Sequence, residues 1–385
     1  MMETGNSFSA VMAVESAGFA RLAEVLLDGI DSREHLGGQV YISRKGVELL
    51  DCSFGWNDSD RLSQLEKDSL ILWRSAGKPL TAIFIAILVS QGKIEFDTPI
   101  VAIVPEFLGD GRDGITVRHL LTHTAGLRGG DRLNESLGWE EMLNRLLAII
   151  PEDGWIPGER AGYHIAGSWY LLGEICSRLM GGITFSELIR KEILLPLGME
   201  KTWVGIPEDL WDSGYSEKIS STYITSADKI SKHPYLDLKW SCCQCRPGGN
   251  ARGPVRDLGK FYEWVEIARR GEVPFLASEI IERMLRPARP PGLFDETFRH
   301  QMDWGLGFMV NSARYGRETV PYGFGRYASE ETYGHGGAQC CSGFADPSHD
   351  LVVCWAVNGL AGEISHQRRI RRINDAIYED LGLVG

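Results

Sequence analysis

The stretch that most constrains the fold of this chain is residues 70–89, where a serine and a lysine precede a nearly continuous apolar segment. Residues 79–89 place apolar side chains on every face of a helix, so we expect this helix to be buried on all sides. Pro79 is tolerated only in a first helical turn, which places the helix start close to Ser75. Ser75 and Lys78 are three positions apart and therefore share one helix face.

The spacing of these two residues puts a candidate base beside a candidate nucleophile. A serine hydroxyl is a weak nucleophile unless a neighbouring group accepts its proton. A desolvated lysine near other cations can lose its own proton and become such a group. Free N–H groups at a helix start also favour a developing oxyanion. Taken alone, a Ser-x-x-Lys pattern is a weak signal, and an ordinary helix start is the alternative interpretation.

Composition and charge exclude several classes of protein. The 385 residues carry a formal net charge of −12, which argues against a nucleic-acid binder and disfavours binding to anionic membranes. Residues 1–20 lack the basic start and continuous apolar core of a secretory signal. Residues 79–89 are too few to span a bilayer, which takes about 20 residues. The sequence therefore predicts a cytoplasmic protein without nucleic-acid or membrane partners.

The cysteines and histidines do not predict a metal site. In a cytosolic chain the eight cysteines are expected to be reduced. His119 and His123 have a spacing that can bind metal, but no acidic third ligand lies nearby, so a structural role is favoured. Two cysteine clusters invite a metal or redox interpretation, but their spacing does not match paired zinc knuckles, and we favour small buried side chains: Cys242, Cys243 and Cys245, and Cys340 and Cys341. We expect neither a metal nor a cofactor.

The order of elements predicts an α+β fold. A helix is expected over 15–29, followed by a hairpin over 37–52 with its turn at 44–46. The middle of the chain, from 139 to 198, has helical periodicity. Strands are expected at 305–310, 332–337, 342–345 and 351–358, and a final helix at 364–381, whose basic run at 368–372 is interpreted as a solvated face. We therefore predict an α/β lobe from about 1–100 and 255–385, and a helical or loop-rich lobe from about 101–254.

Several stretches, taken together and in order, resemble one superfamily. They are Ser75-Ala76-Gly77-Lys78, the Val-Arg-His-Leu-Leu-Thr-His-Thr-Ala-Gly-Leu segment at 117–127, the Tyr163 region at 157–175, and residues 247–261 and 334–347. The chain resembles the serine β-lactamase-like hydrolases: class C β-lactamases, low-molecular-weight penicillin-binding proteins, D-aminopeptidases and family VIII-type esterases. The resemblance covers nearly the whole chain. It implies a β-lactamase/transpeptidase-like fold, with an antiparallel sheet flanked by helices and a mostly helical lobe.

The resemblance also implies roles for individual residues. Ser75 would attack a carbonyl and form an acyl-enzyme, and Lys78 and Tyr163 would share the general-base work. A tyrosine acts as a base near neutrality only if its pKa is strongly lowered, so which of the two takes the proton stays open. His335 would stand where the family has a lysine. The backbone N–H groups of Ser75 and Ala338 would form the oxyanion hole. The remaining expected substrate contacts are Gly336, Gly337 and Ile165.

Two departures from the family pattern bear on the substrate. Ile165 stands where an asparagine usually helps to hold substrate, and His335-Gly336-Gly337 stands where the family has Lys-Thr-Gly. A histidine near its usual pKa carries only a partial charge. These differences favour a carboxylesterase acting on small acyl substrates over a β-lactamase. An acyltransferase or amidase using the same nucleophile is the near alternative, and a catalytically silent binding or scaffold protein is the alternative from another class.

Overall fold

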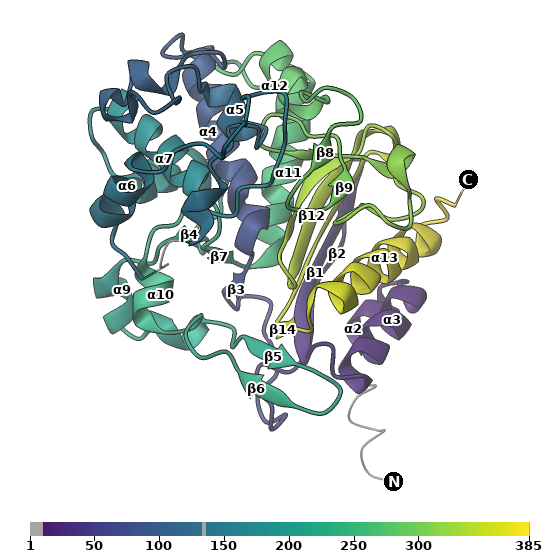
Figure 1. Cartoon of the computed structure of the whole chain (residues 1–385). Coiled ribbons are helices and arrows are strands. Elements are labelled where there is room, and N and C mark those ends of the chain that lie inside the picture. The colour runs from purple at the N-terminus through teal and green to yellow at the C-terminus, as the bar shows by residue number, and fades with distance from the viewer. Residues whose placement is uncertain (1–10, 133–135, 385) are drawn as a thin grey trace.

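A six-stranded antiparallel sheet brings the two ends of the chain together. The computed structural model describes residues 11–132 and 136–384. Within them, β1 pairs with both β2 and β13, so the first strands lie beside the last ones (Figure 1). In spatial order the strands are β10 (Met309–Val310), β11 (Tyr333–Gly337), β12 (Cys341–Asp346), β13 (Leu351–Val357), β1 (Gly37–Arg44) and β2 (Val47–Gly55).

The hairpin at the start of the sheet confirms the prediction from its glycine turn. Lys45 and Gly46 both adopt positive φ, 54° and 73°, which suits a two-residue turn between antiparallel strands. The predicted strand at 305–310 is mostly wrong. Gly307 turns there with φ 84° and donates its N–H to the carbonyl of Leu121, so only β10 remains paired in the sheet.

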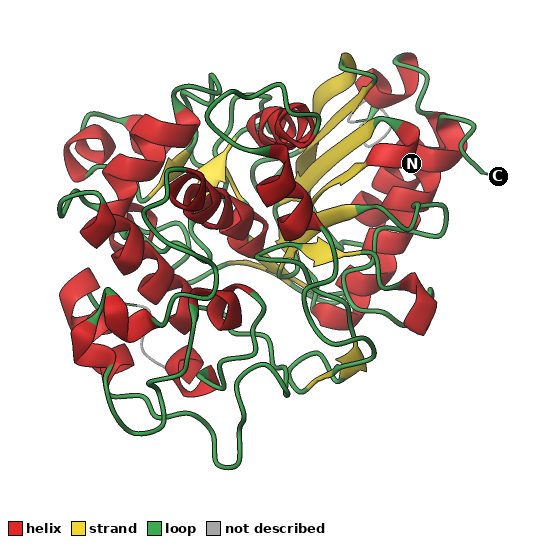
Figure 2. Ribbon diagram, turned by 90° about the horizontal axis from the view of Figure 1, so that it is seen from above, coloured by secondary structure: helices red, strands yellow, loops and turns green. Residues whose placement is uncertain are grey.

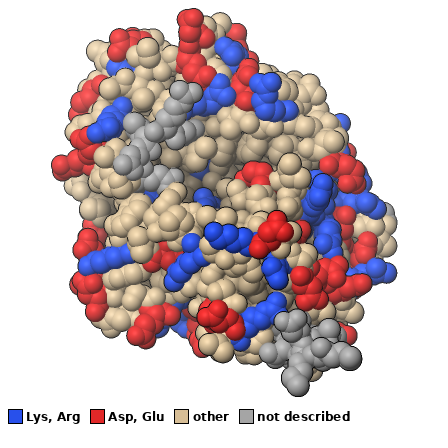
Figure 3. Space-filling model, turned by 60° about the horizontal axis from the view of Figure 1, so that its bottom comes forward, with Lys and Arg blue, Asp and Glu red and all other residues tan. Residues whose placement is uncertain are grey.

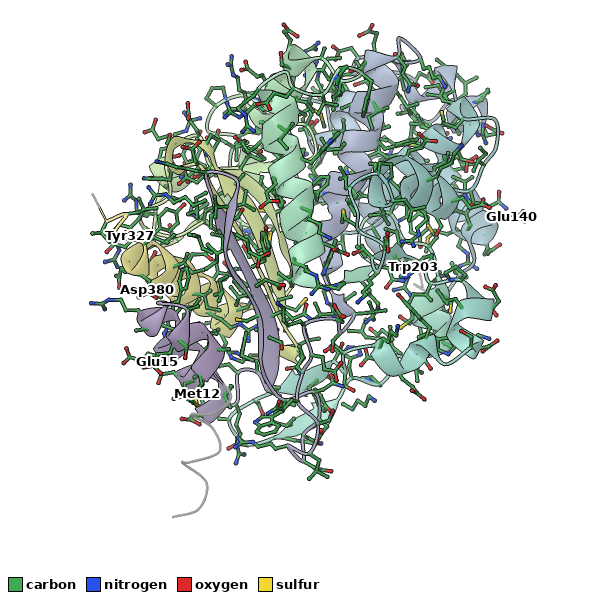
Figure 4. All side chains as sticks on the ribbon, turned by 180° about the vertical axis from the view of Figure 1, so that it is seen from behind. Met12, Glu15, Glu140, Trp203, Tyr327 and Asp380 are labelled. Atoms are coloured by element: carbon green, nitrogen blue, oxygen red, sulfur yellow. The ribbon has the colours of Figure 1, made fainter. Side chains whose placement is uncertain are left out.

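Helices cover both faces of the sheet. On one face lie α2 (Met12–Ser16), α3 (Ala20–Asp31) and α13 (Glu363–Asp380), and on the other lies α11 (Val255–Arg269) (Figures 1 and 4). The label for Asp380 lies on the same side of Figure 4 as those for Met12 and Glu15. The single helix predicted at 15–29 is two helices, because Gly18 adopts φ 93° between α2 and α3.

The apolar segment after Lys78 forms α4 (Lys78–Ser90), and every residue from Lys78 to Val89 is buried, which confirms the prediction of a helix buried on all sides. Figure 2 shows helices crowded together on one side of the main sheet, the side on which Figure 1 places α4. None of the helices in the described ranges combines the length and the apolar character needed to cross a membrane. The remaining helices are α5 (Val117–Leu121), α6 (Trp139–Leu147), α7 (Gly167–Leu179), α8 (Phe185–Ile189), α9 (Glu208–Asp212), α10 (Lys239–Cys243) and α12 (Ser278–Leu285).

Short strands form small sheets of their own outside the main sheet. β3 (Ile71–Leu72) pairs with β7 (Ala251–Gly253), which also pairs with β4 (Trp203–Val204). Two further small sheets are β14 (Gly359–Leu360) with β5 (Tyr223–Thr225) and β6 (Ile230–Lys232), and β8 (Phe294–Asp295) with β9 (His300–Gln301). On the face shown in Figure 3, acidic and basic side chains are interspersed around a hollow near the middle. The division into two lobes stays a prediction.

The basic run on α13 is not wholly a solvated face, which corrects the prediction. Arg369 is buried, whereas Arg368 is exposed. The Arg369 guanidinium donates to the carbonyls of Glu34, Gln339 and Gly359, at 2.8, 2.8 and 3.2 Å. Burial lowers the pKa of this guanidinium to about 10, which still leaves it charged at neutral pH. Arg369 therefore ties α13 to three segments at one end of the sheet, before β1, after β11 and after β13.

Replacing Arg369 should destabilise the protein far more than replacing its neighbour. Arg369→Met removes a buried guanidinium that donates to three carbonyls, so we expect the free energy of unfolding to fall by about 2–5 kcal/mol. Arg368→Met is the matched control, and we expect a change within about 0.5 kcal/mol, as is usual at exposed sites. Urea unfolding followed by circular dichroism measures both. Equal stabilities of the two variants would contradict the structural role of Arg369.

Candidate active site

Ser75 lies on a short turn between a strand and the buried helix. β3 leads into a 3₁₀ turn, η1 (Arg74–Gly77), and α4 starts directly after it at Lys78. The helix start expected near Ser75 is thus divided into a 3₁₀ turn and an α-helix. The N–H of Ser75 belongs to the first turn, where amides have no partner within the helix. A Cβ at Gly77 would come within 2.6 Å of the Ala251 Cβ, so a glycine allows this turn to pack against β7.

Lys78 is fully buried beneath the serine. Its Nζ lies 3.2 Å from the Ser75 Oγ, 2.7 Å from the carbonyl oxygen of Ile165 and 2.5 Å from that of Gly248. Backbone carbonyls only accept hydrogen bonds, so two of them around one amine favour its protonated form. The spacing of Ser75 and Lys78 in the sequence therefore places the two groups in contact, as predicted.

Tyr163 lies beside this pair, in a loop fixed by a buried carboxylate. The Lys78 Nζ is 5.3 Å from the centre of the Tyr163 ring. The Tyr163 backbone N–H donates to the Asp295 Oδ1 at 3.1 Å, and the fully buried Asp295 pairs with Arg289 at 3.0 Å. Thr297 donates its hydroxyl to the Tyr163 carbonyl. Sequence analysis missed Asp295 and Arg289, because neither belongs to a motif that signals its partner.

His335 faces the same tyrosine but is not the partial cation that we expected. The two ring centres are 6.1 Å apart. The His335 Nδ1 lies 2.8 Å from the Gly336 carbonyl oxygen and must donate to it, and its Nε2 has no partner within the described ranges. Burial lowers the pKa of His335 to about 3, and the charge of Lys78 adds to the effect. The imidazole is therefore neutral at physiological pH, which corrects the prediction.

Gly336 and Gly337 allow strands and loops to approach closely, and neither lines the pocket beside Ser75. A Cβ at Gly337 would collide with the Trp73 carbonyl oxygen, and one at Gly336 would collide with the Tyr322 ring. The glycine at 337 therefore lets β11 lie directly against the segment that carries the nucleophile. This contact brings Ala338, the residue after β11, to the pocket that Ser75 also lines.

A small pocket of about 90 Å³ opens beside the serine. Ser75, Ala338 and Ile165 line it, so three of the residues expected from the sequence meet there, whereas Tyr163 and His335 are not part of its wall. Two arginines that sequence analysis missed, Arg74 and Arg246, also line it. Arg74 could have been suspected from the sequence because it directly precedes the serine, whereas Arg246 has no such position.

The histidines and cysteines considered as metal ligands have other surroundings. The His119 Nδ1 accepts the N–H of Thr116 and so caps α5, and the His123 Nδ1 accepts the N–H of His164. All eight cysteines lie in described positions and carry free thiols. The described part of the chain brings together no group of three or more histidine, cysteine or acidic side chains that would hold a metal.

The low pKa of His335 predicts a pH profile without a contribution from this imidazole. Because its pKa is lowered from 6.5 to about 3, His335 should gain no proton between pH 8 and pH 5, a range in which an ordinary histidine titrates. The pH dependence of kcat/KM for a short-chain ester should thus show the same inflections in the wild type and in His335→Asn. Nitrogen NMR of the His335 ring should show Nδ1 protonated and Nε2 unprotonated from pH 8 to about pH 5. An inflection near pH 6.5 that the variant lacks would contradict this assignment.

Two curated esterases are similar to part of this chain. The esterase/β-lactamase LipL of Mycobacterium tuberculosis is 28% identical over 264 residues, which are 68% of this chain and 58% of LipL. Esterase EstB of Burkholderia gladioli is 30% identical over 204 residues, 47% of this chain and 50% of EstB. The matches thus span only about half of each curated relative.

The fold is shared over nearly the whole chain. The solved structure of EstCE1, described as a hydrolase with promiscuous acyltransferase activity, superposes with a TM-score of 0.75 at 22% identity and covers 95% of this chain and 99% of its own. A penicillin-binding protein homologue from Caulobacter crescentus also superposes, with a TM-score of 0.73 at 23% identity over 93% of this chain and 97% of its own, which confirms the expected β-lactamase/transpeptidase-like α+β fold. The sequence model described as Beta-lactamase matches residues 19–377. Because this match covers nearly the whole chain, the chain belongs to the Beta-lactamase family.

Proposed function

We propose that this protein is a serine hydrolase, a carboxylesterase that cleaves small esters through an acyl-enzyme on Ser75. The observation that carries the proposal is the 3.2 Å contact between the Lys78 Nζ and the Ser75 Oγ beside a small pocket. A hydroxyl that accepts a hydrogen bond from a buried ammonium, at the first turn of a helix, lies where the charge left by loss of its proton would be stabilised. The names of LipL and EstB as esterases support this reaction class.

The proposed reaction has two halves. The Ser75 Oγ bonds to the ester carbonyl carbon and gives up its proton, and the oxyanion forms hydrogen bonds with the N–H groups of Ser75 and Ala338. The C–O bond then breaks, and the alcohol leaves with that proton. Water attacks the acyl-enzyme in the second half, which releases the acid and restores the serine. Because two carbonyls favour an ammonium at Lys78, we assign the proton transfers to Tyr163, with Lys78 stabilising its phenolate.

Esters suit this site better than β-lactams do. The carboxylate of a β-lactam lies on the side of the leaving nitrogen, where the family's lysine and threonine would bind it. Here that side offers His335, which is neutral, and Gly336, which has no hydroxyl. An unpaired buried polar group costs about 1–3 kcal/mol. A neutral ester has no carboxylate there to satisfy.

Acyl transfer is the second candidate, favoured by one observation. EstCE1, which shares the fold, is described as having promiscuous acyltransferase activity. An alcohol or amine that reached the acyl-enzyme before water would take the acyl group by the same steps. An amidase would use the same nucleophile. A catalytically silent binding or scaffold protein would not need the contact between Lys78 and Ser75. The cytoplasmic location, the small-molecule acyl partner, and the lack of nucleic-acid and membrane partners stay predictions.

Ester turnover should greatly exceed β-lactam turnover. We expect kcat/KM for p-nitrophenyl acetate or butyrate to exceed that for a chromogenic cephalosporin by at least about thirtyfold, since two lost polar contacts each cost about 1–3 kcal/mol. Ser75→Ala is the control and should lose both activities and the covalent acyl adduct seen by intact mass spectrometry. Equal efficiency on the cephalosporin would overturn the esterase assignment. An adduct that persists in Ser75→Ala would overturn the choice of nucleophile.

Lys78 and Tyr163 should act as one unit. If the proton passes through a Tyr163 whose charge Lys78 stabilises, removing either group disables the other. Lys78→Ala, Tyr163→Phe and the double variant should therefore all fall to a similar floor, on the order of 10³-fold below wild type. Ester kinetics on the three variants measure this, with circular dichroism to confirm folding. Losses that multiply in the double variant would show that the two residues act independently.

A further inference from the structure

Arg74 is a cation beside the nucleophile, and the described residues include no ion-pair partner for it. It immediately precedes Ser75, and the two residues line the same pocket. Its Nε is buried and makes no hydrogen bond, and none of the ion pairs among described residues includes it. The position of the guanidinium is indicated by its effect on Cys340. Burial raises the pKa of the Cys340 thiol, and the positive charge of Arg74 opposes this rise more than any other charge does. The guanidinium therefore lies close to the turn after β11, the turn that carries Ala338.

The fully buried arginines differ from the partly buried Arg74 in this respect. Arg289 pairs with Asp295, Arg252 donates to Leu236, and Arg369 donates to three carbonyls. Arg246, across the pocket, donates its Nε to the Gln244 side chain at 2.9 Å. Buried polar groups in native proteins nearly always have partners, and an exception calls for an explanation. A ligand that completes the contacts of Arg74 is such an explanation.

The backbone at Arg74 is held in an unfavourable conformation. Its φ is 47°, in the left-handed region that a long side chain rarely adopts. Such strain persists only where the surrounding structure enforces it, and it concentrates at functional sites. Here the turn directs the chain from β3 into the nucleophile, and the strained residue is one of those that line the pocket.

The pocket is suited to the acyl part of the substrate. Tyr163 receives and returns protons in the proposed reaction, and it does not line the pocket. The leaving alcohol takes its proton on the Tyr163 side, so the acyl chain points the other way, into the pocket. The walls there include Leu72, Met142 and Leu236, which suit methylene groups. The volume of about 90 Å³ admits only a short chain.

We propose that Arg74 binds a carboxylate at the far end of a short acyl chain, so that the preferred substrates are half-esters of dicarboxylic acids. A guanidinium matches a carboxylate through two parallel charge-assisted hydrogen bonds. The apolar walls hold the methylene groups between the ester carbonyl at Ser75 and this second carboxylate. The inference rests on the proposed esterase function and adds the chemical class of its substrate.

A matched pair of esters tests the inference. Monoethyl glutarate and ethyl pentanoate have the same acyl length and leaving group, and differ in the terminal carboxylate. We expect the wild type to favour the half-ester by about tenfold to a hundredfold in kcat/KM, measured by ethanol release. High salt should reduce this preference, because it screens charge pairs. No preference in the wild type, or a preference for the neutral ester, would overturn the inference.

Variants separate the role of Arg74 from that of the site as a whole. Arg74→Gln should reduce the ratio of the two kcat/KM values to about one, and Arg74→Lys should retain part of the preference because it keeps the charge. Arg270→Gln, an exposed arginine paired with Glu272, is the control and should keep the wild-type ratio. A ratio that Arg74→Gln leaves unchanged would overturn the role of Arg74. If p-nitrophenyl butyrate also failed to acylate Ser75, the esterase function itself would fall, and the inference with it.

Discussion

The rest of the site depends on the contact between the buried amine of Lys78 and the hydroxyl of Ser75. A buried ammonium is tolerated only where acceptors surround it. Here those acceptors come from two distant parts of the chain, the carbonyls of Ile165 and Gly248. One cation therefore gathers α4, the loop of Tyr163 and the loop before β7. Ile165 and Gly248, whose carbonyls accept from Lys78, also line the pocket. The same contacts therefore stabilise the buried charge and shape the pocket.

A second constraint is the close approach of β11 to the turn of the nucleophile. The glycine at 337 removes the side chain that would separate the strand from Trp73. The sheet is assembled from both ends of the chain, so a strand near the C-terminus sets the position of Ala338, the proposed oxyanion donor, beside a serine near the N-terminus. Arg369 reinforces this geometry, because its guanidinium binds the carbonyl of Gln339, the residue directly after Ala338.

Much of this arrangement could be predicted from local sequence. The hairpin of β1 and β2, the buried helix α4 and the contact of Ser75 with Lys78 depend on short-range patterns, and the structure has all three. The environment of a charged or titratable group could not be predicted, because it depends on long-range packing. His335 is neutral because other segments of the chain bury it. Arg369 is buried where α13 packs beside segments such as the one that carries Glu34, which is 335 residues away in the sequence. Asp295, which orients the Tyr163 loop, belongs to no motif.

The buried histidines have a consequence for the whole molecule. Burial lowers the pKa of each of five imidazoles below its usual 6.5, so the folded chain holds them neutral: His35, His123, His164, His335 and His366. In the unfolded chain these groups regain their ordinary pKa and bind protons below about pH 6.5. Stability from this source is fully present above that pH and is lost progressively as the medium becomes acidic. Unfolding below about pH 6.5 is therefore coupled to the uptake of protons by these imidazoles.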